Sequence, residues 1–202
     1  MQLYINPPKS SWSLRVWALC RQLNIPIETK IVRYLADKDA QRQQFLVFSP
    51  TAKIPVLHHE GRTIWDSLAI VEYLAEDFPA IWPQDKTARA WARSACAEMH
   101  AGFALLREIC DFKPLERIQL TEISPELKKE LARLDQLWQE GLSRFGGPFL
   151  AGNDFTAADA FFLPVAGRIE TYGLEAHFSP QSLAYQQTLL ALPAYQAWLK
   201  LG

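Results

Sequence analysis

Residues 52–67 place a proline, an acid and a helix start close together along the chain. Pro55 heads a strand pattern, and a cis Ile54–Pro55 bond, about 0.5–1 kcal/mol above trans, turns the N–H and C=O of Ile54 toward solvent. Two such groups pair readily with an extended peptide as an added strand. Asp66 and Ser67 open a helix, where a carboxylate attracts an ammonium and the helix amides attract a carboxylate. The stretch therefore predicts a site for a short zwitterionic peptide.

Each of these features also has a purely structural interpretation. Proline is tolerated as the first residue of an edge strand, and Asp66 and Ser67 are ordinary helix-capping residues. Lys53 is either a surface lysine or the partner of a second carboxylate. The peptide-site hypothesis therefore depends on the combination and not on a single residue.

Three serines surround a tryptophan between the first strand and the first helix, in Ser10-Ser11-Trp12-Ser13. Either one serine only caps the helix, or one hydroxyl donates a hydrogen bond to a thiolate. Lowering a thiol pKa of about 8.5 by two units takes roughly 2.7 kcal/mol. A hydrogen bond to a charged group contributes about 1.5–3 kcal/mol and a helix N-terminus about 0.3–1 kcal/mol. A serine and a helix end together are therefore sufficient, without a general base.

Hydrophobic periodicity divides the chain near residue 80. Before that point, strand and helix patterns follow in the order β-α-β-α-β-β-α, which is small enough for one α/β layer structure. After it the strand signals vanish and helical spacing continues. The predicted domains are residues 1–78 and 86–202, joined by a linker at residues 79–85. Helices are expected in the second domain at residues 86–110, 125–145, 156–172 and 181–199.

The composition is that of an ordinary soluble globular protein, with 202 residues, 49% hydrophobic, and a net charge of −1. Such a charge attracts neither nucleic acid nor an anionic membrane. No apolar stretch approaches the roughly 18 residues of a membrane span, and no signal-peptide pattern is evident, so we expect a cytoplasmic protein. Cys20, Cys96 and Cys110 form no Cys-x-x-Cys pair and predict no disulfide framework.

Together, these motifs resemble the cytosolic glutathione S-transferases, in particular bacterial members of the serine type with a zeta-, tau- or theta-like N-terminal motif. Ser-Ser-Trp-Ser-Leu-Arg-Val resembles the zeta-class Ser-Ser-Cys-Ser-Trp-Arg-Val. This maps the family's thiol-activating serine onto Ser10, with Ser11 and Ser13 as alternatives because two prolines precede the loop. Thr156-x-x-Asp159 resembles the family's capping box. The resemblance implies a thioredoxin-like α/β domain followed by an all-helical domain.

The resemblance also implies ligands and the residues that contact them. Glutathione is the expected co-substrate, no metal is expected, and a small-molecule electrophile is expected between the serine loop and the second domain. Phe103 has core packing as an alternative role, and His100 an ordinary helix position. The residues implied for glutathione are Lys53, Ile54, Pro55, Asp66 and Ser67. Those implied for the electrophile are Trp12, His100, Phe103 and Arg107.

The implied activity is transfer of glutathione to a hydrophobic electrophile by a homodimer. One alternative is a glutathione-dependent isomerase of maleylacetoacetate type, suggested by the double serine, although Trp12 replaces the zeta cysteine tied to that chemistry. Another is a non-catalytic module that keeps the fold for protein interaction. Retention of Ser10 and of the Ile54 to Ser67 features argues against that module.

Overall fold

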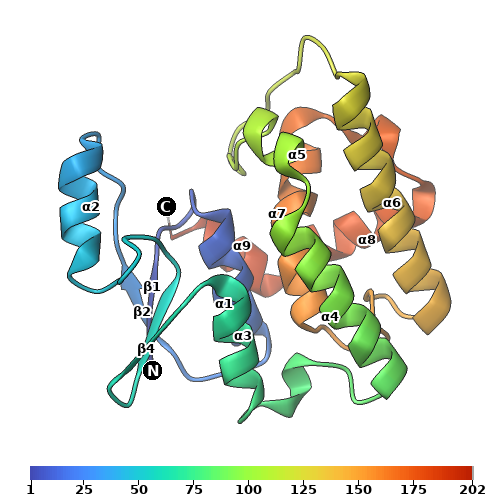
Figure 1. Ribbon diagram of the computed structural model, residues 1–202. Helices are drawn as coiled ribbons and strands as arrows, with labels where there is room; N and C mark the ends of the chain where they lie inside the picture. Colours follow the sequence, from blue (N-terminus) through green and yellow to red (C-terminus); the bar gives the residue numbers. More distant parts are fainter. Residues whose placement is uncertain (202) are drawn as a thin grey trace.

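The N-terminal part of the chain forms one mixed four-stranded sheet with the strand order β2-β1-β3-β4. A computed structural model describes residues 1–201 (Figure 1). β1 (Gln2–Ile5) pairs in parallel with β2 (Glu28–Ile31) and antiparallel with β3 (Val56–His59), which pairs with β4 (Arg62–Trp65). A parallel pair needs a crossover connection, and α1 (Ser11–Gln22) provides it.

The remaining helices of this part are α2 and α3, so the order β-α-β-α-β-β-α is confirmed. α2 spans Lys38–Leu46 and α3 spans Ser67–Ala75. A short 3₁₀ turn, η1 (Pro79–Ile81), leads to the helical part of the chain. In Figure 1, α2 lies on the side of the sheet away from the later helices.

The C-terminal part is helical in all its regular structure within the described residues, as predicted. α7 packs against α1, α4 and α8 and stands at the centre of this part. Its residues are all buried apart from Glu170. The elements are α4 (Lys86–Ala101), α5 (Ala104–Ile109), α6 (Pro125–Phe145), α7 (Ala157–Tyr172), η2 (Glu175–His177), α8 (Pro180–Leu190) and α9 (Pro193–Leu199).

Two predicted helices are each divided, and the prediction of single helices there was wrong. The helix expected at residues 86–110 breaks at Gly102 and Phe103, where Phe103 adopts a left-handed conformation with φ 56° and ψ 44°. The Arg107 side chain donates to the carbonyls of Met99 and Gly102, which satisfies groups left free at the end of α4. The helix expected at residues 181–199 breaks because Pro193 begins a new one.

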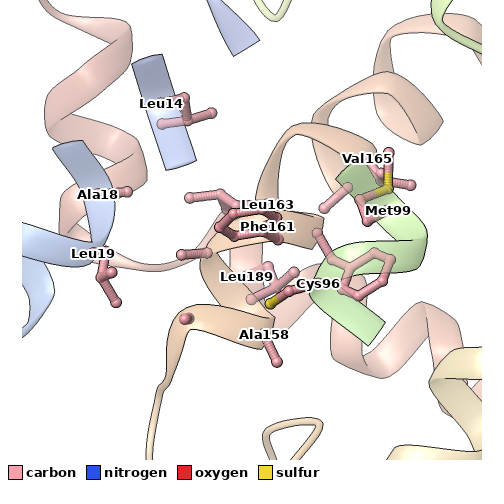
Figure 2. Close-up of a cluster of buried hydrophobic side chains, with 14 of the residues drawn as sticks. Leu14, Ala18, Leu19, Cys96, Met99, Ala158, Phe161, Leu163, Val165 and Leu189 are labelled. Carbon is pink, nitrogen blue, oxygen red and sulfur yellow. The ribbon is translucent and has the colours of Figure 1, made fainter. Parts of the chain in front are cut away.

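One hydrophobic core joins the two parts of the chain. Figure 2 shows Leu14 and Ala18 of α1, Phe161 of α7, and Cys96 and Met99 of α4 within one cluster of buried side chains. All five side chains are at most 1% exposed. Burying a large apolar side chain contributes about 1.5–3 kcal/mol, so α1 is held firmly against the helical part.

The capping box at the start of α7 is present, as the resemblance implied. One carboxylate oxygen of Asp159 accepts from the Thr156 N–H, at 2.9 Å, and from the Thr156 hydroxyl. The other accepts from the Leu150 N–H and from the Tyr185 hydroxyl. Complete burial raises the pKa of Asp159 to about 6 despite these hydrogen bonds. The Asp159 carboxylate therefore links the loop at Leu150, the start of α7 and Tyr185 of α8 by hydrogen bonds.

We predict that Asp159→Ala lowers the free energy of unfolding by about 3 kcal/mol, because it removes the acceptor of four buried donors. Asp85 is a suitable control, since it caps α4 through the Ala88 N–H but is exposed. Asp85→Ala should cost only about 1 kcal/mol. Urea unfolding of both variants measures these changes in the free energy of unfolding. Equal decreases in the two variants would contradict the linking role of Asp159.

Candidate functional site

A groove of about 670 Å³ runs between the start of α1, α2 and the segment from residue 51 to residue 67. The five residues implied for glutathione, Lys53, Ile54, Pro55, Asp66 and Ser67, all line it, and so does Trp12. The structure thus brings together every residue of the predicted peptide site. The other lining residues are Tyr34, Lys38, Gln41, Phe45, Thr51, Ala52 and Trp65.

Ile54 offers an unpaired stretch of backbone to this groove. It precedes β3, and no described residue makes a backbone hydrogen bond to its N–H or C=O. The Ile54–Pro55 peptide bond is cis, as predicted. The loop before it is fixed by Ser49, whose hydroxyl donates to the Lys53 C=O at 2.7 Å and accepts from the Lys53 N–H. A rigid, unpaired edge of this kind can receive an extended peptide.

Asp66 also lines the groove, at the N-terminus of α3. Its φ of 73° is uncommon for a residue other than glycine, and such a conformation persists only where the surroundings determine it. Oδ1 accepts from the Leu68 N–H at 2.8 Å, and Oδ2 lies 3.3 Å from Nε2 of His100. The neighbouring Ser67 is 1% exposed, and its hydroxyl has no partner. The start of α3 therefore combines the negative charge of Asp66, the unpaired hydroxyl of Ser67 and the helix amides.

Trp12 is surrounded by positively charged and aromatic groups from both parts of the chain. The Arg15 guanidinium lies 4.3 Å from its ring centroid, that of Arg107 lies 5.1 Å away, and the His100 ring approaches edge-on. Arg15 is sandwiched between Trp12 and Phe161. Burial, with smaller contributions from nearby arginines, lowers the pKa of Arg15 to about 9, so it stays charged at neutral pH.

His100 is held beside this positive group. Burial lowers the pKa of His100 below the ordinary value, and Arg15 and Arg107 lower it further, whereas Asp66 raises it. At neutral pH the imidazole is therefore uncharged, and Nε2 is the nitrogen that faces Asp66. Its Nδ1 is buried without a partner. His100 thus connects α4 to Asp66 at the start of α3.

The four residues implied for the electrophile are placed differently from one another. Trp12 lines the groove, and His100 contacts Asp66. Arg107 donates to carbonyls at the end of α4, and Phe103 is 7% exposed, within the core. The structure brings Trp12, His100 and Arg107 together, but of the four only Trp12 lines the groove.

None of the three candidate serines lines the groove. Ser10 is the N-cap of α1, accepts from the Ser13 N–H at 3.1 Å and is 3% exposed. Ser11 lies 3.5 Å from a guanidinium nitrogen of Arg168. Ser13 is fully buried and its hydroxyl has no partner. All three serines are therefore buried.

Sequence reasoning missed several groove residues from the segment between β2 and β3. Lys38 and Gln41 lie three residues apart on α2 and belong to one helix face. That spacing was a usable signal, because the buried Phe45 follows four residues after Gln41 on the same face. Tyr34 lies in a loop without periodicity, so nothing in the sequence pattern indicated its position.

The described residues 1–201 contain no group of three or more histidine, cysteine, aspartate or glutamate side chains placed to hold a metal ion. Within the same range, no helix has both the length and the apolar character needed to cross a membrane.

The mixed sheet, its helices and the helical part define a thioredoxin-like domain followed by an all-helical domain. The family model described as "Glutathione S-transferase, N-terminal domain" matches residues 9–77, and "Glutathione S-transferase, C-terminal domain" matches residues 89–201. Since these matches cover most of the sequence, the chain belongs to the glutathione S-transferase family.

Similar proteins agree with this assignment. Glutathione S-transferase U6 of Arabidopsis thaliana is 30% identical over 200 residues, covering 93% of this chain and 82% of the relative. Probable maleylacetoacetate isomerase 1 of Drosophila melanogaster is 25% identical over 193 residues, covering 95% and 77%. A sphingomonad glutathione S-transferase solved in complex with glutathione is 25% identical, with a TM-score of 0.71 and coverage of 100% and 98%.

We predict that Asp66→Asn lowers the pKa of His100 further, because the Asp66 charge raises it in the native protein. The asparagine keeps the α3 cap, so the fold is retained. A ¹H–¹³C NMR titration of the imidazole measures the shift, with Asp85→Asn as a control far from the site. An unchanged pKa of His100 in Asp66→Asn would show that the two side chains do not interact in solution.

Proposed function

We propose that this protein is a glutathione transferase that activates the glutathione thiol for attack on a hydrophobic electrophile. The observation that carries the proposal is the groove, in which the unpaired Ile54 backbone, Asp66 and Ser67 face one cavity. Membership of the glutathione S-transferase family supports it. Glutathione is then the co-substrate, and no metal takes part.

In the proposed complex the peptide lies extended along Ile54. The N–H and C=O of Ile54 pair with its cysteinyl backbone, as an added strand does. Asp66 meets the ammonium of the γ-glutamyl end, while Ser67 and the amides of α3 hold the neighbouring carboxylate. Lys53 attracts the carboxylate of the glycyl end. Lys38 lines the same groove and adds positive charge for the second carboxylate.

The proposed reaction begins with loss of the thiol proton to solvent. The thiolate is stabilised by a hydroxyl donor near the start of α1, the role mapped onto Ser10, with Ser11 and Ser13 as alternatives. The sulfur then forms a bond to the electrophilic carbon, and the leaving group departs with the electron pair. A donor and a helix N-terminus supply the roughly 2.7 kcal/mol that a two-unit shift of the thiol pKa requires.

We further propose the domain roles implied by the family. Residues 1–78 bind glutathione, residues 79–85 are the linker, and residues 86–202 contribute to the electrophile pocket. The turn η1 between α3 and α4 supports this division. A cytoplasmic detoxification role is proposed with it, and the three cysteines support the location because all are free and buried, as in a reducing compartment.

We also propose a homodimer in which one subunit's first domain packs against the other's helices. Val47 is 86% exposed and Trp65 is 47% exposed, both in the first domain, which supports an apolar contact there. Gel filtration should give about twice the 23.0 kDa mass of the chain. A single species at the mass of one chain would contradict the dimer.

A glutathione-dependent isomerase of maleylacetoacetate type is the second candidate. Relatives named probable maleylacetoacetate isomerase and the double serine favour it. The positive charges of Arg15 and Arg107 beside Trp12 also suit a diacid. Turnover of a cis-enone diacid with negligible transfer to aryl halides distinguishes this candidate. A non-catalytic interaction module remains the third, and it predicts no heat on titration with glutathione.

Calorimetric titration with glutathione tests the proposed function. The native protein should bind, and Asp66→Asn should weaken binding by about 10- to 150-fold, the equivalent of a charge-assisted hydrogen bond of about 1.5–3 kcal/mol. Because asparagine keeps the helix cap, the loss reports the charge alone. Asp85→Asn serves as the control. Absence of heat with the native protein would contradict the proposal, and an unchanged dissociation constant would limit Asp66 to capping α3.

A further inference from the structure

The loop that precedes α1 has few backbone donors of its own. It runs from Asn6 to Ser10 and contains Pro7 and Pro8, which have no N–H. Among the described residues, the one backbone hydrogen bond within this loop joins the Ser10 N–H to the Asn6 C=O, at 2.9 Å. The carbonyls of the two prolines therefore depend on donors from elsewhere in the chain.

Those donors are two side chains that lie far from the loop in sequence. The indole N–H of Trp198, in α9, donates to the Pro8 C=O at 3.3 Å. A terminal guanidinium nitrogen of Arg33 donates to the Pro7 C=O at 2.5 Å. The other terminal nitrogen of Arg33 donates to the Leu201 C=O at 3.3 Å. Arg33 thus bridges the loop and the residues that follow α9.

Trp198 also contacts the helix that follows the loop. Its ring centroid lies 5.5 Å from that of Trp17 in α1, and both side chains belong to the buried core. The Trp17 indole N–H in turn donates to the Thr29 hydroxyl of β2. α9 packs against α1, as Figure 1 shows. One side chain of α9 therefore holds both the loop before Ser10 and the helix after it.

The edge proposed to bind the peptide is held by different contacts. The Ser49 hydroxyl bonds the Lys53 backbone, and β3 begins two residues after Ile54. Neither Trp198 nor Arg33 lines the groove. A substitution at Trp198 or Arg33 can therefore displace the start of α1 without changing the Ile54 edge.

We propose that Trp198 is a positioning residue for the proposed reaction, which together with Arg33 holds the loop from Asn6 to Ser10 so that the start of α1 stabilises the thiolate of bound glutathione. This inference rests on the proposed function. Through it, the helical part of the chain contributes to thiol activation from residues that line no part of the groove. Supporting contacts of this kind determine how precisely a reactive site is held.

The test is the pKa of the glutathione thiol in the complex with Trp198→Phe, measured by thiolate absorbance as the pH is varied. Phenylalanine keeps an aromatic ring and removes the donor to Pro8. We expect the thiol pKa to rise by about 0.5–1 unit, because the rise cannot exceed the free energy of the lost hydrogen bond. Transfer to an aryl halide at neutral pH should fall by roughly 3- to 10-fold, with a dissociation constant of glutathione within about threefold of the native value.

Trp138→Phe is the matched control. Trp138 and Trp198 are both 0% exposed, but the indole N–H of Trp138 has no partner. This substitution therefore removes the same atoms from the core without breaking a hydrogen bond. Both variants should unfold at lower urea concentrations than the native protein, whereas only Trp198→Phe should change the thiol pKa.

Arg33→Lys decides the question if Trp198→Phe does not fold. Arg33 is exposed, so its replacement leaves the core intact. Lysine keeps the positive charge and replaces the forked guanidinium with a single nitrogen. We expect the thiol pKa to rise in this variant as well, with a urea midpoint close to the native one.

The inference is overturned if the thiol pKa keeps its native value in Trp198→Phe or, where that variant does not fold, in Arg33→Lys. It is also overturned if Trp138→Phe raises the thiol pKa as much as Trp198→Phe does, because general loosening of the core would then be the cause. In each of these cases the proposed transferase function stands. If the native protein binds no glutathione, the proposed function fails and this inference fails with it.

Discussion

The packing of α1 against α7 is the contact on which the candidate site depends. Leu14 and Ala18 of α1 belong to the same buried cluster as Phe161 of α7 (Figure 2). Trp198 of α9, in the C-terminal part of the chain, packs against Trp17 of α1. The indole N–H of Trp198 donates a hydrogen bond to the Pro8 C=O. These contacts fix both the helix and the loop before it. The start of α1 is therefore held at a constant distance from the Ile54 edge, which the sheet positions independently.

Three neighbouring arginines, Arg15, Arg107 and Arg168, concentrate positive charge at the boundary between the two parts of the chain. Burial lowers the pKa of Arg15 most, and Arg107 and Arg168 lower it further, whereas Asp66 raises it. Arg15 has two buried donor nitrogens without partners, which is costly unless the site meets water or an anion.

Most of the fold and the peptide-binding edge could be predicted because their signals are local. The hairpin of β3 and β4 returns the chain between Pro55 and Asp66. The sequence spacing alone therefore predicted that Ile54, Pro55, Asp66 and Ser67 lie in one groove. The break before α5 could not be predicted, because the apolar stripe through Met99, Phe103 and Leu106 continues across it. The position of Tyr34 beside the groove was equally hidden, since Tyr34 lies in a loop without periodicity.

A crystal structure of the protein with glutathione is the most direct test of the whole account. We expect the cysteinyl backbone paired with the N–H and C=O of Ile54, and the sulfur beside the start of α1. A groove that stays empty at saturating glutathione, or a peptide bound with its sulfur away from the start of α1, would contradict the account.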